Sequence, residues 1–164
     1  NRTTARDGHY GIHLAVALGR YAAIPEEFSV KLDVDVKSEK AEKDNLILIG
    51  GPGTNLLTAD VNDVLPIRFD SGNYWAGLFD PTGRNYASTR NGLIAKIRNP
   101  FDPHKRIVVL AGVGHEGTKS AVIALANFHE QTLEKYHGEE SWATIIQGLD
   151  LNGDGKVDAV EVVA

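Results

Sequence analysis

The residues with the clearest chemical potential lie near the end of the sequence, where residues 150–161 read DLNGDGKVDAVE. This stretch matches every fixed position of the calcium-loop pattern D-x-[DN]-x-[DN]-G-x5-E. Calcium is a hard cation that takes about six to eight oxygen ligands, so the chain must wrap around it. We therefore predict oxygen ligands at alternate positions and at the end of the loop: Asp150, Asn152, Asp154, the backbone carbonyl of Lys156, Asp158 and Glu161.

Two further positions fit such a loop. Gly155 would permit its sharp turn, and Val157 would pack inward. Aspartate, asparagine and glycine are also ordinary turn residues, but chance rarely satisfies every fixed position together. No second loop of this kind occurs in the sequence. Because a lone, weak loop is typical of extracellular modules, we predict a structural calcium site and not a cytosolic calcium sensor.

A glycine pattern stands earlier in the chain, where Gly112, Gly114 and Gly117 form G-x-G-x-x-G between an apolar run and a helix-like segment. A dinucleotide-binding fingerprint also needs an acidic residue on the next strand, about 20 residues later, to bind the ribose. That position falls at the end of the expected helix. A P-loop fails as well, because Thr118 interrupts the required Gly-Lys pair. We favour a tight turn that lets the helix pack on the sheet; the alternative is a nucleotide- or sugar-phosphate-binding enzyme that uses the Gly112–Gly117 turn.

Other catalytic patterns are missing from the sequence. His9 and His13 can share one helix face, but a zinc site needs one or two more ligands. No H-E-x-x-H and no G-x-S-x-G motif occurs. The chain has no cysteine, which excludes disulfides, thiolate metal sites and a cysteine nucleophile. We therefore predict no catalytic residue and no enzymatic activity.

Four aromatic residues cluster in a stretch rich in glycine and asparagine: Tyr74, Trp75, Phe79 and Tyr86. Aromatic faces can stack on sugars, although such residues more often cover a sheet. A glycan-binding cell-wall module, with envelope glycan as its partner, is therefore a further alternative.

Composition restricts the class of protein. A chain of 164 residues can form one well-buried domain, and its net charge of −5 argues against a nucleic-acid partner. No apolar run approaches the length of a membrane-spanning segment. Because the sequence lacks methionine and ends within a pattern, we expect a piece of a larger polypeptide. Asn1-Arg2-Thr3 matches a glycosylation sequon, for which chance is the better explanation.

Hydrophobic periodicity predicts both helices and strands. Apolar residues recur at helical spacing over 7–23, and Pro25 would end that helix. Residues 28–36 alternate between apolar and polar, which predicts a half-exposed strand. The continuous apolar runs 46–49 and 107–111 predict strands buried on both faces, as in parallel sheets.

The remaining expected elements alternate in the same way. They are a helix within 54–65, a strand at 67–69, a hairpin or loop over 70–90 with its turn at 80–83, a strand at 93–97, a long helix over 116–136 and a short helix over 141–147. This alternation predicts an α/β layered domain with a mostly parallel or mixed sheet flanked by helices, followed by an EF-hand-like calcium loop. We divide the chain into an α/β envelope domain over 1–149 and the calcium-binding loop and tail over 150–164.

Three stretches together resemble a known family. Residues 44–55 read DNLILIGGPGTN, residues 91–118 run from NGLIAKIRNPFDPHKRIVVLAG to GHEGT, and residues 148–162 read GLDLNGDGKVDAVEV. In order and spacing they resemble the C-terminal domain of archaeal surface-layer (S-layer) proteins. The resemblance implies an extracellular, non-catalytic envelope protein that assembles with copies of itself or with neighbouring domains. The expected calcium ligands rest on the loop itself and not on the resemblance.

Overall fold

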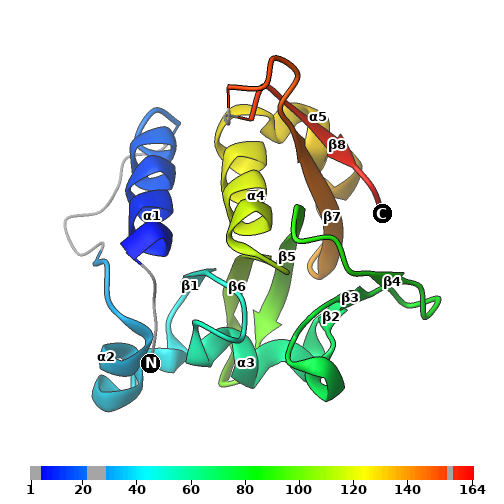
Figure 1. The fold of residues 1–164 in the computed structure, drawn as a ribbon. Coiled ribbons are helices and arrows are strands. Elements are labelled where there is room, and N and C mark those ends of the chain that lie inside the picture. Colours follow the sequence, from blue (N-terminus) through cyan, green and yellow to red (C-terminus); the bar gives the residue numbers. More distant parts are fainter. Residues whose placement is uncertain (1–4, 22–28, 155–156) are drawn as a thin grey trace.

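The computed structural model describes residues 5–21, 29–154 and 157–164. Its central feature is a five-stranded sheet in the order β1-β6-β5-β7-β8 (Figure 1). Only the β1–β6 pair is parallel, and the other three pairs are antiparallel. The mixed form of the predicted sheet is therefore the one observed. The strands are β1 (Leu46–Ile49), β5 (Asn91–Asn99), β6 (Asp102–Gly112), β7 (Trp142–Leu149) and β8 (Ala159–Val162).

Each face of the sheet has its own apolar layer. Helices α1 (Ala5–Leu18) and α4 (His115–Asn127) pack on one face, where Leu14, Leu110 and Val122 share a cluster. The opposite face carries α3 (Leu56–Val61) and a small three-stranded sheet, as Figure 1 shows. The strands of that small sheet are β2 (Arg68–Phe69), β3 (Leu78–Phe79) and β4 (Asn85–Tyr86).

Successive residues of the central strands alternate between these two layers. Val109 joins the cluster beneath α3, whereas the next residue, Leu110, joins the cluster beneath α1 and α4. The same alternation separates Ile145 from Ile146 on β7. A continuous apolar run is thus buried on both faces in β6, as predicted. In β1 the same prediction holds only in part, because Ile47 remains 40% exposed at the edge of the sheet.

The strand predicted over 28–36 is wrong. Residues 33–39 instead form helix α2 (Asp33–Glu39), and Phe28 lies outside the described residues. The Asp33 carboxylate accepts hydrogen bonds from the N–H groups of Val34 (2.9 Å) and of Leu56 (2.8 Å), the first residue of α3, so it joins α2 to α3. Val36 is buried while Val30 is 81% exposed, so the alternating valines do not share one buried face.

The short helix predicted over 141–147 is also wrong, because residues 142–147 belong to β7. Thr144, Ile145 and Ile146 are fully buried between β5 and β8. Their β-branched side chains favour an extended chain that packs on both faces. A segment of this length could form a short helix or a strand. Pairing with β5 and β8 makes it a strand.

The other elements agree with the sequence more closely. The predicted 80–83 turn is confirmed and joins β3 to β4, and Asp80 accepts hydrogen bonds there from Thr82, Arg84 and Tyr86. The helix predicted over 7–23 ends at Leu18, and residues 22–23 lie outside the described part. The long helix predicted over 116–136 is divided into α4, α5 (His129–Leu133) and the 3-10 helix η4 (Glu134–Tyr136). Three further short helices complete the described elements: η1 (Ala41–Lys43), η2 (Asn62–Val64) and η3 (Ser71–Asn73).

Candidate functional site

The two glycine-rich turns of the sequence meet at one end of the sheet. Because β1 and β6 are parallel, the Gly50–Gly53 turn after β1 lies beside the Gly112–Gly114 turn after β6. The helices that follow these turns, α3 and α4, pack on opposite faces of the sheet. In open α/β sheets, a crevice forms outside the carboxyl ends of strands where the chain turns in opposite directions. This end of the sheet is therefore the first candidate site.

The turn after β1 is fixed by Asn55. Its side-chain oxygen accepts hydrogen bonds from the N–H groups of Leu57 (3.0 Å) and Thr58 (3.2 Å), which caps α3. The same amide group donates to the carbonyl of Ile49 at 3.2 Å. Gly50 has a φ of 106°, which favours glycine in this turn.

The G-x-G-x-x-G glycines serve close packing. A Cβ atom on Gly112 would lie 2.2 Å from the backbone nitrogen of Thr118, and one on Gly117 would lie 2.1 Å from the carbonyl oxygen of Asn91. A Cβ atom on Gly92 would lie 2.2 Å from the carbonyl oxygen of Gly117. The first turn of α4 therefore packs against the backbone of β5 and β6, which supports the interpretation as a tight strand-to-helix turn.

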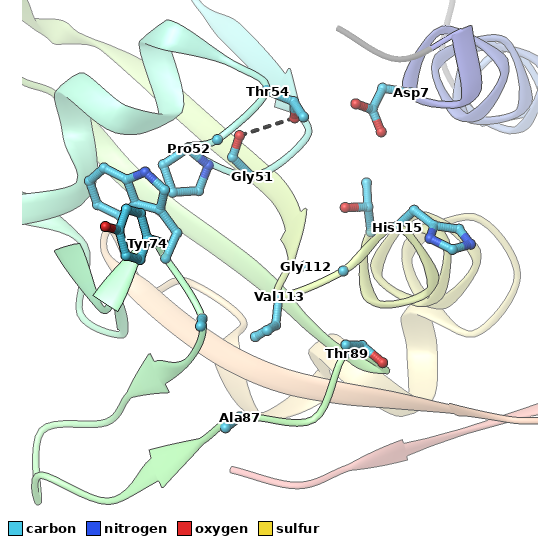
Figure 2. A pocket seen from close by; sticks show the side chains of 15 residues that line it. Asp7, Gly51, Pro52, Thr54, Tyr74, Ala87, Thr89, Gly112, Val113 and His115 are labelled. Carbon is cyan, nitrogen blue, oxygen red and sulfur yellow. Dashed lines mark hydrogen bonds between the residues drawn. The ribbon is translucent and has the colours of Figure 1, made fainter. Parts of the chain in front are cut away.

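Between the two turns lies a cleft with a volume of about 470 Å³ (Figure 2). Its walls combine the glycine backbone with Asp7 of α1, His115 and Thr118 of α4, and Thr54 and Thr89 from loops. Asp7 is only 6% exposed, so its carboxylate is buried where the cleft meets α1. The sequence gives no signal for this residue, because it precedes the cleft-forming turns by more than forty positions.

The aromatic stretch is divided between two roles. Tyr74 and Trp75 line the cleft, and both have a positive φ, 50° and 67°. Phe79 belongs to β3, whereas Tyr86 is a buried part of the core. Burial and the hydrogen bond to Asp80 raise the pKa of the Tyr86 hydroxyl. The sequence placed all four residues in one group, but only the first two are candidates for ligand contact.

The predicted calcium loop closes on itself through its own carboxylates. Asp158 Oδ2 accepts hydrogen bonds from the N–H groups of Leu151 (2.8 Å) and Asn152 (3.3 Å). Asp150 Oδ1 accepts from the N–H groups of Gly153 (2.7 Å) and Asp154 (3.2 Å). The Asp158 contacts thus bring the ninth residue of the loop to the residues that follow its first.

The calcium ligands at 150–161 stay a prediction from the sequence. Gly155 and Lys156 lie outside the described residues, and within the described ranges no group of three histidine or carboxylate side chains is arranged to hold a metal. The loop leads into strand β8, where Glu161 pairs with Gln147. Val157 packs against the apolar cluster beneath α4, as predicted. Residues 159–162, assigned from sequence to the loop and tail, thus add an edge strand to the main sheet.

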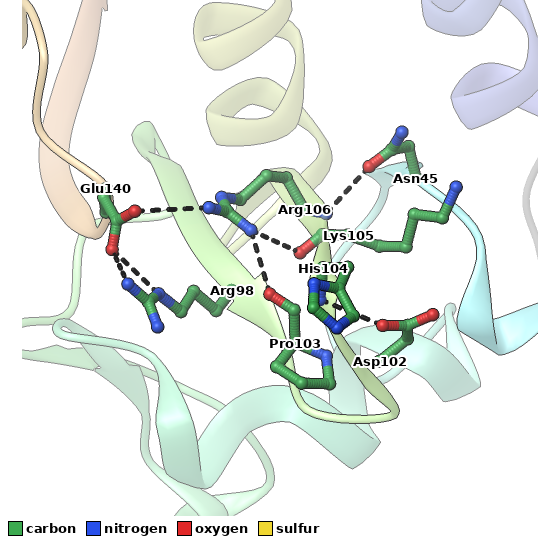
Figure 3. Close-up of polar contacts among 8 residues, drawn as sticks. All are labelled: Asn45, Arg98, Asp102, Pro103, His104, Lys105, Arg106 and Glu140. Carbon is green, nitrogen blue, oxygen red and sulfur yellow. Dashed lines mark hydrogen bonds and ion pairs between the residues drawn. The ribbon is translucent and has the colours of Figure 1, made fainter.

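Two other groups of polar residues lie outside the cleft and the loop. His9 and His13 both lie on exposed positions of α1. A cluster that the sequence did not suggest joins β5, β6 and the segment before β7 (Figure 3). There Glu140 binds the guanidinium groups of Arg98 and Arg106. Arg98 in particular holds the pKa of the Glu140 carboxyl below its usual range.

Comparison with known proteins identifies the chain's relatives. The model of the S-layer like family, outer domain, matches residues 22–129, which is well over half of the chain. The chain belongs to this S-layer like family. The resemblance inferred from the sequence is thereby confirmed, and the family's description is that of a structural surface layer.

One curated relative is an uncharacterized protein of Methanocaldococcus jannaschii, 30% identical over 112 residues. The match covers 66% of this chain but only 21% of that relative, so the chain spans about a fifth of its length. No solved structure matches the chain. Within the described residues, every helix is too short or too polar to cross a membrane.

Proposed function

We propose that this chain is a non-catalytic structural module of an extracellular surface layer, where it assembles with copies of itself or with neighbouring domains of the same polypeptide. Membership of the S-layer like family carries the proposal. The relative's much greater length supports the involvement of neighbouring domains, because most of that protein lies outside the matched part.

The surface of the molecule offers apolar contacts for such assembly. Ile12 and Val16 lie one turn apart on α1 and are 67% and 60% exposed. Residues four apart on a helix share one face. At the edge of the sheet, Ile47 is 40% exposed on β1, which pairs only with β6 among the described strands. An unpaired edge and exposed apolar side chains favour contact with another chain or domain.

Calcium is the second part of the proposal. The residues suit the ion, because the loop's side chains supply the oxygen donors that calcium prefers. The carboxylates of Asp150 and Asp158 accept hydrogen bonds from backbone N–H groups of the same loop, which supports a loop that folds around these two side chains. When bound, the ion would supply charge neutralisation and crosslink the loop that joins β7 to β8. Glu161 lies in β8 opposite Gln147. Its role as a calcium ligand is therefore tested by a variant of its own.

Sedimentation velocity over a range of protein concentrations tests the assembly. In calcium buffer the wild-type protein should associate, and a double variant with Ile12→Ser and Val16→Ser should associate less. Val64→Ser is the matched control, because Val64 is 53% exposed but lies in η2 on the opposite side of the sheet. A wild-type protein that stays monomeric at every concentration, and that does not crosslink to neighbours on intact cells, would contradict the proposal.

A further inference from the structure

The cleft contains a buried carboxylate, Asp7, that assembly into a surface layer does not require. Its side chain is 6% exposed, and a Cβ atom on Gly50 would lie 3.2 Å from its Oδ2 atom. Within residues 5–21, 29–154 and 157–164, no side-chain hydrogen bond or ion pair engages its carboxylate. A carboxylate that is largely shielded from water favours nearby hydrogen-bond donors. The carboxylate faces the cleft in Figure 2, so a ligand there would supply the missing hydrogen-bond donors.

The other wall of the cleft offers the opposite polarity. Helix α4 begins there, with Gly114 as an N-cap that provides no side-chain cap. The first N–H groups of a helix carry a partial positive charge. Gly117 already donates its N–H to the carbonyl of Thr89 at 3.1 Å, and His115, the first residue of α4, lines the cleft.

A ligand must satisfy both walls. A phosphate would meet the Asp7 carboxylate at close range, and like charges repel. A cation would meet the positive end of α4. Hydroxyl groups both donate and accept hydrogen bonds, so a neutral polyhydroxyl ligand fits both walls.

The rim of the cleft adds aromatic surface. Tyr74 is 95% exposed, and both it and Trp75 have a left-handed backbone. Non-glycine residues rarely adopt this conformation, and where they do they cluster at functional sites. Both residues line the cleft, with Tyr74 at its exposed rim.

We propose that this cleft binds a neutral saccharide. Asp7 accepts hydrogen bonds from sugar hydroxyl groups, while the hydroxyl of Thr89 and the start of α4 supply further polar contacts. Tyr74 and Trp75 stack on the apolar C–H faces of the ring. The volume of about 470 Å³ lies in the range of small-molecule sites. The site is separate from the calcium loop and from the surfaces assigned to assembly.

Ligand-observed NMR with methyl glycosides of neutral hexoses and N-acetylhexosamines tests the proposal. Titration in a Trp142→Phe background then gives the affinity from the fluorescence of Trp75, since the chain has two tryptophans. Asp7→Asn should weaken binding about tenfold or more, because a charged acceptor is lost. Tyr74→Ala should weaken it as well, and its exposed side chain can be removed without loss of folding. Asp63→Asn, an exposed carboxylate outside the cleft, should have no effect.

Several results would overturn this assignment. They are an absence of binding for every neutral glycoside, tighter binding of glucose 6-phosphate or ATP than of the neutral sugars, and unchanged binding in both cleft variants when circular dichroism shows them folded. Isolated wall polysaccharide and released protein-linked oligosaccharides form two further arms. Binding of either supports the proposal and identifies the source of the sugar.

Discussion

Gly112 and Gly117 approach so closely that a Cβ atom on Gly112 would lie 2.5 Å from the carbonyl carbon of Gly117. The end of β6 and the first turn of α4 therefore touch backbone to backbone. The same contact closes one wall of the cleft. The G-x-G-x-x-G pattern, which is associated with nucleotide binding, serves close packing in this protein. Replacing single glycines by alanine tests that function.

Gly117→Ala should destabilise the protein by about 1–3 kcal/mol or more, because overpacking forces the backbone to shift. Gly8→Ala is the matched control, since Gly8 lies in α1 and a Cβ atom there would meet nothing within 4 Å. That control should be neutral or more stable by about 0.5–1 kcal/mol, as expected for alanine in a helix. Urea unfolding measures both changes. Equal stability of the two variants would show that the glycines are not required for packing.

Asn62→Ala should cost about 1–3 kcal/mol, because it leaves buried backbone groups without partners. Asn62 is 3% exposed, accepts a hydrogen bond from the N–H of Phe69 at 2.8 Å and donates to its carbonyl at 3.1 Å. These contacts join η2 to β2. Asn73→Ala, at an exposed position, is the control for the same chemical change. If urea unfolding gives the same loss for both, the pair of hydrogen bonds does not stabilise the fold.

Glu140 should make stability depend on pH. Arg98 lowers the pKa of its carboxyl in the folded state, so its contribution is complete above the unfolded pKa and is lost as pH falls through the lower folded pKa. Glu140→Gln should therefore lower the Tm at neutral pH by a small amount that disappears in acid and in high salt. Glu139→Gln is the control, since that exposed neighbour makes no such pair among the described residues. A pH-independent difference between the two variants would contradict this account.

The sequence predicts well those segments whose residue pattern fits only one kind of secondary structure. Residues 107–111 are apolar, short and bounded by turns, and they form the middle of the sheet. Residues 33–36 and 141–147 fit two structures, and contacts with distant residues decide between them. Asp33 binds the N–H of Leu56, and β7 pairs with β5 and β8. Local periodicity contains no information about such partners.

The candidate sites divide in the same way. The calcium loop can be recognised from sequence because all its donors lie within twelve consecutive residues. The cleft brings together Asp7, Tyr74 and His115, which are far apart in the chain. Only the parallel pairing of β1 with β6 and the position of α1 place them around one space. The sequence could identify the aromatic pair as a candidate but could not assign it a carboxylate partner.

Thermal unfolding tests most directly the claim that this chain is a calcium-stabilised structural module and not a nucleotide-using enzyme. The protein is unfolded in EDTA, in calcium, and in calcium with NAD or ATP, with Asp150→Asn and Glu161→Gln as loop variants and Asp63→Asn as control. We predict a rise in Tm with calcium, corresponding to about 2.7 kcal/mol at a hundredfold excess over Kd. The rise should be lost in Asp150→Asn, reduced in Glu161→Gln, kept in Asp63→Asn and unaffected by nucleotide. A Tm that does not change with calcium but rises with NAD or ATP would contradict the account.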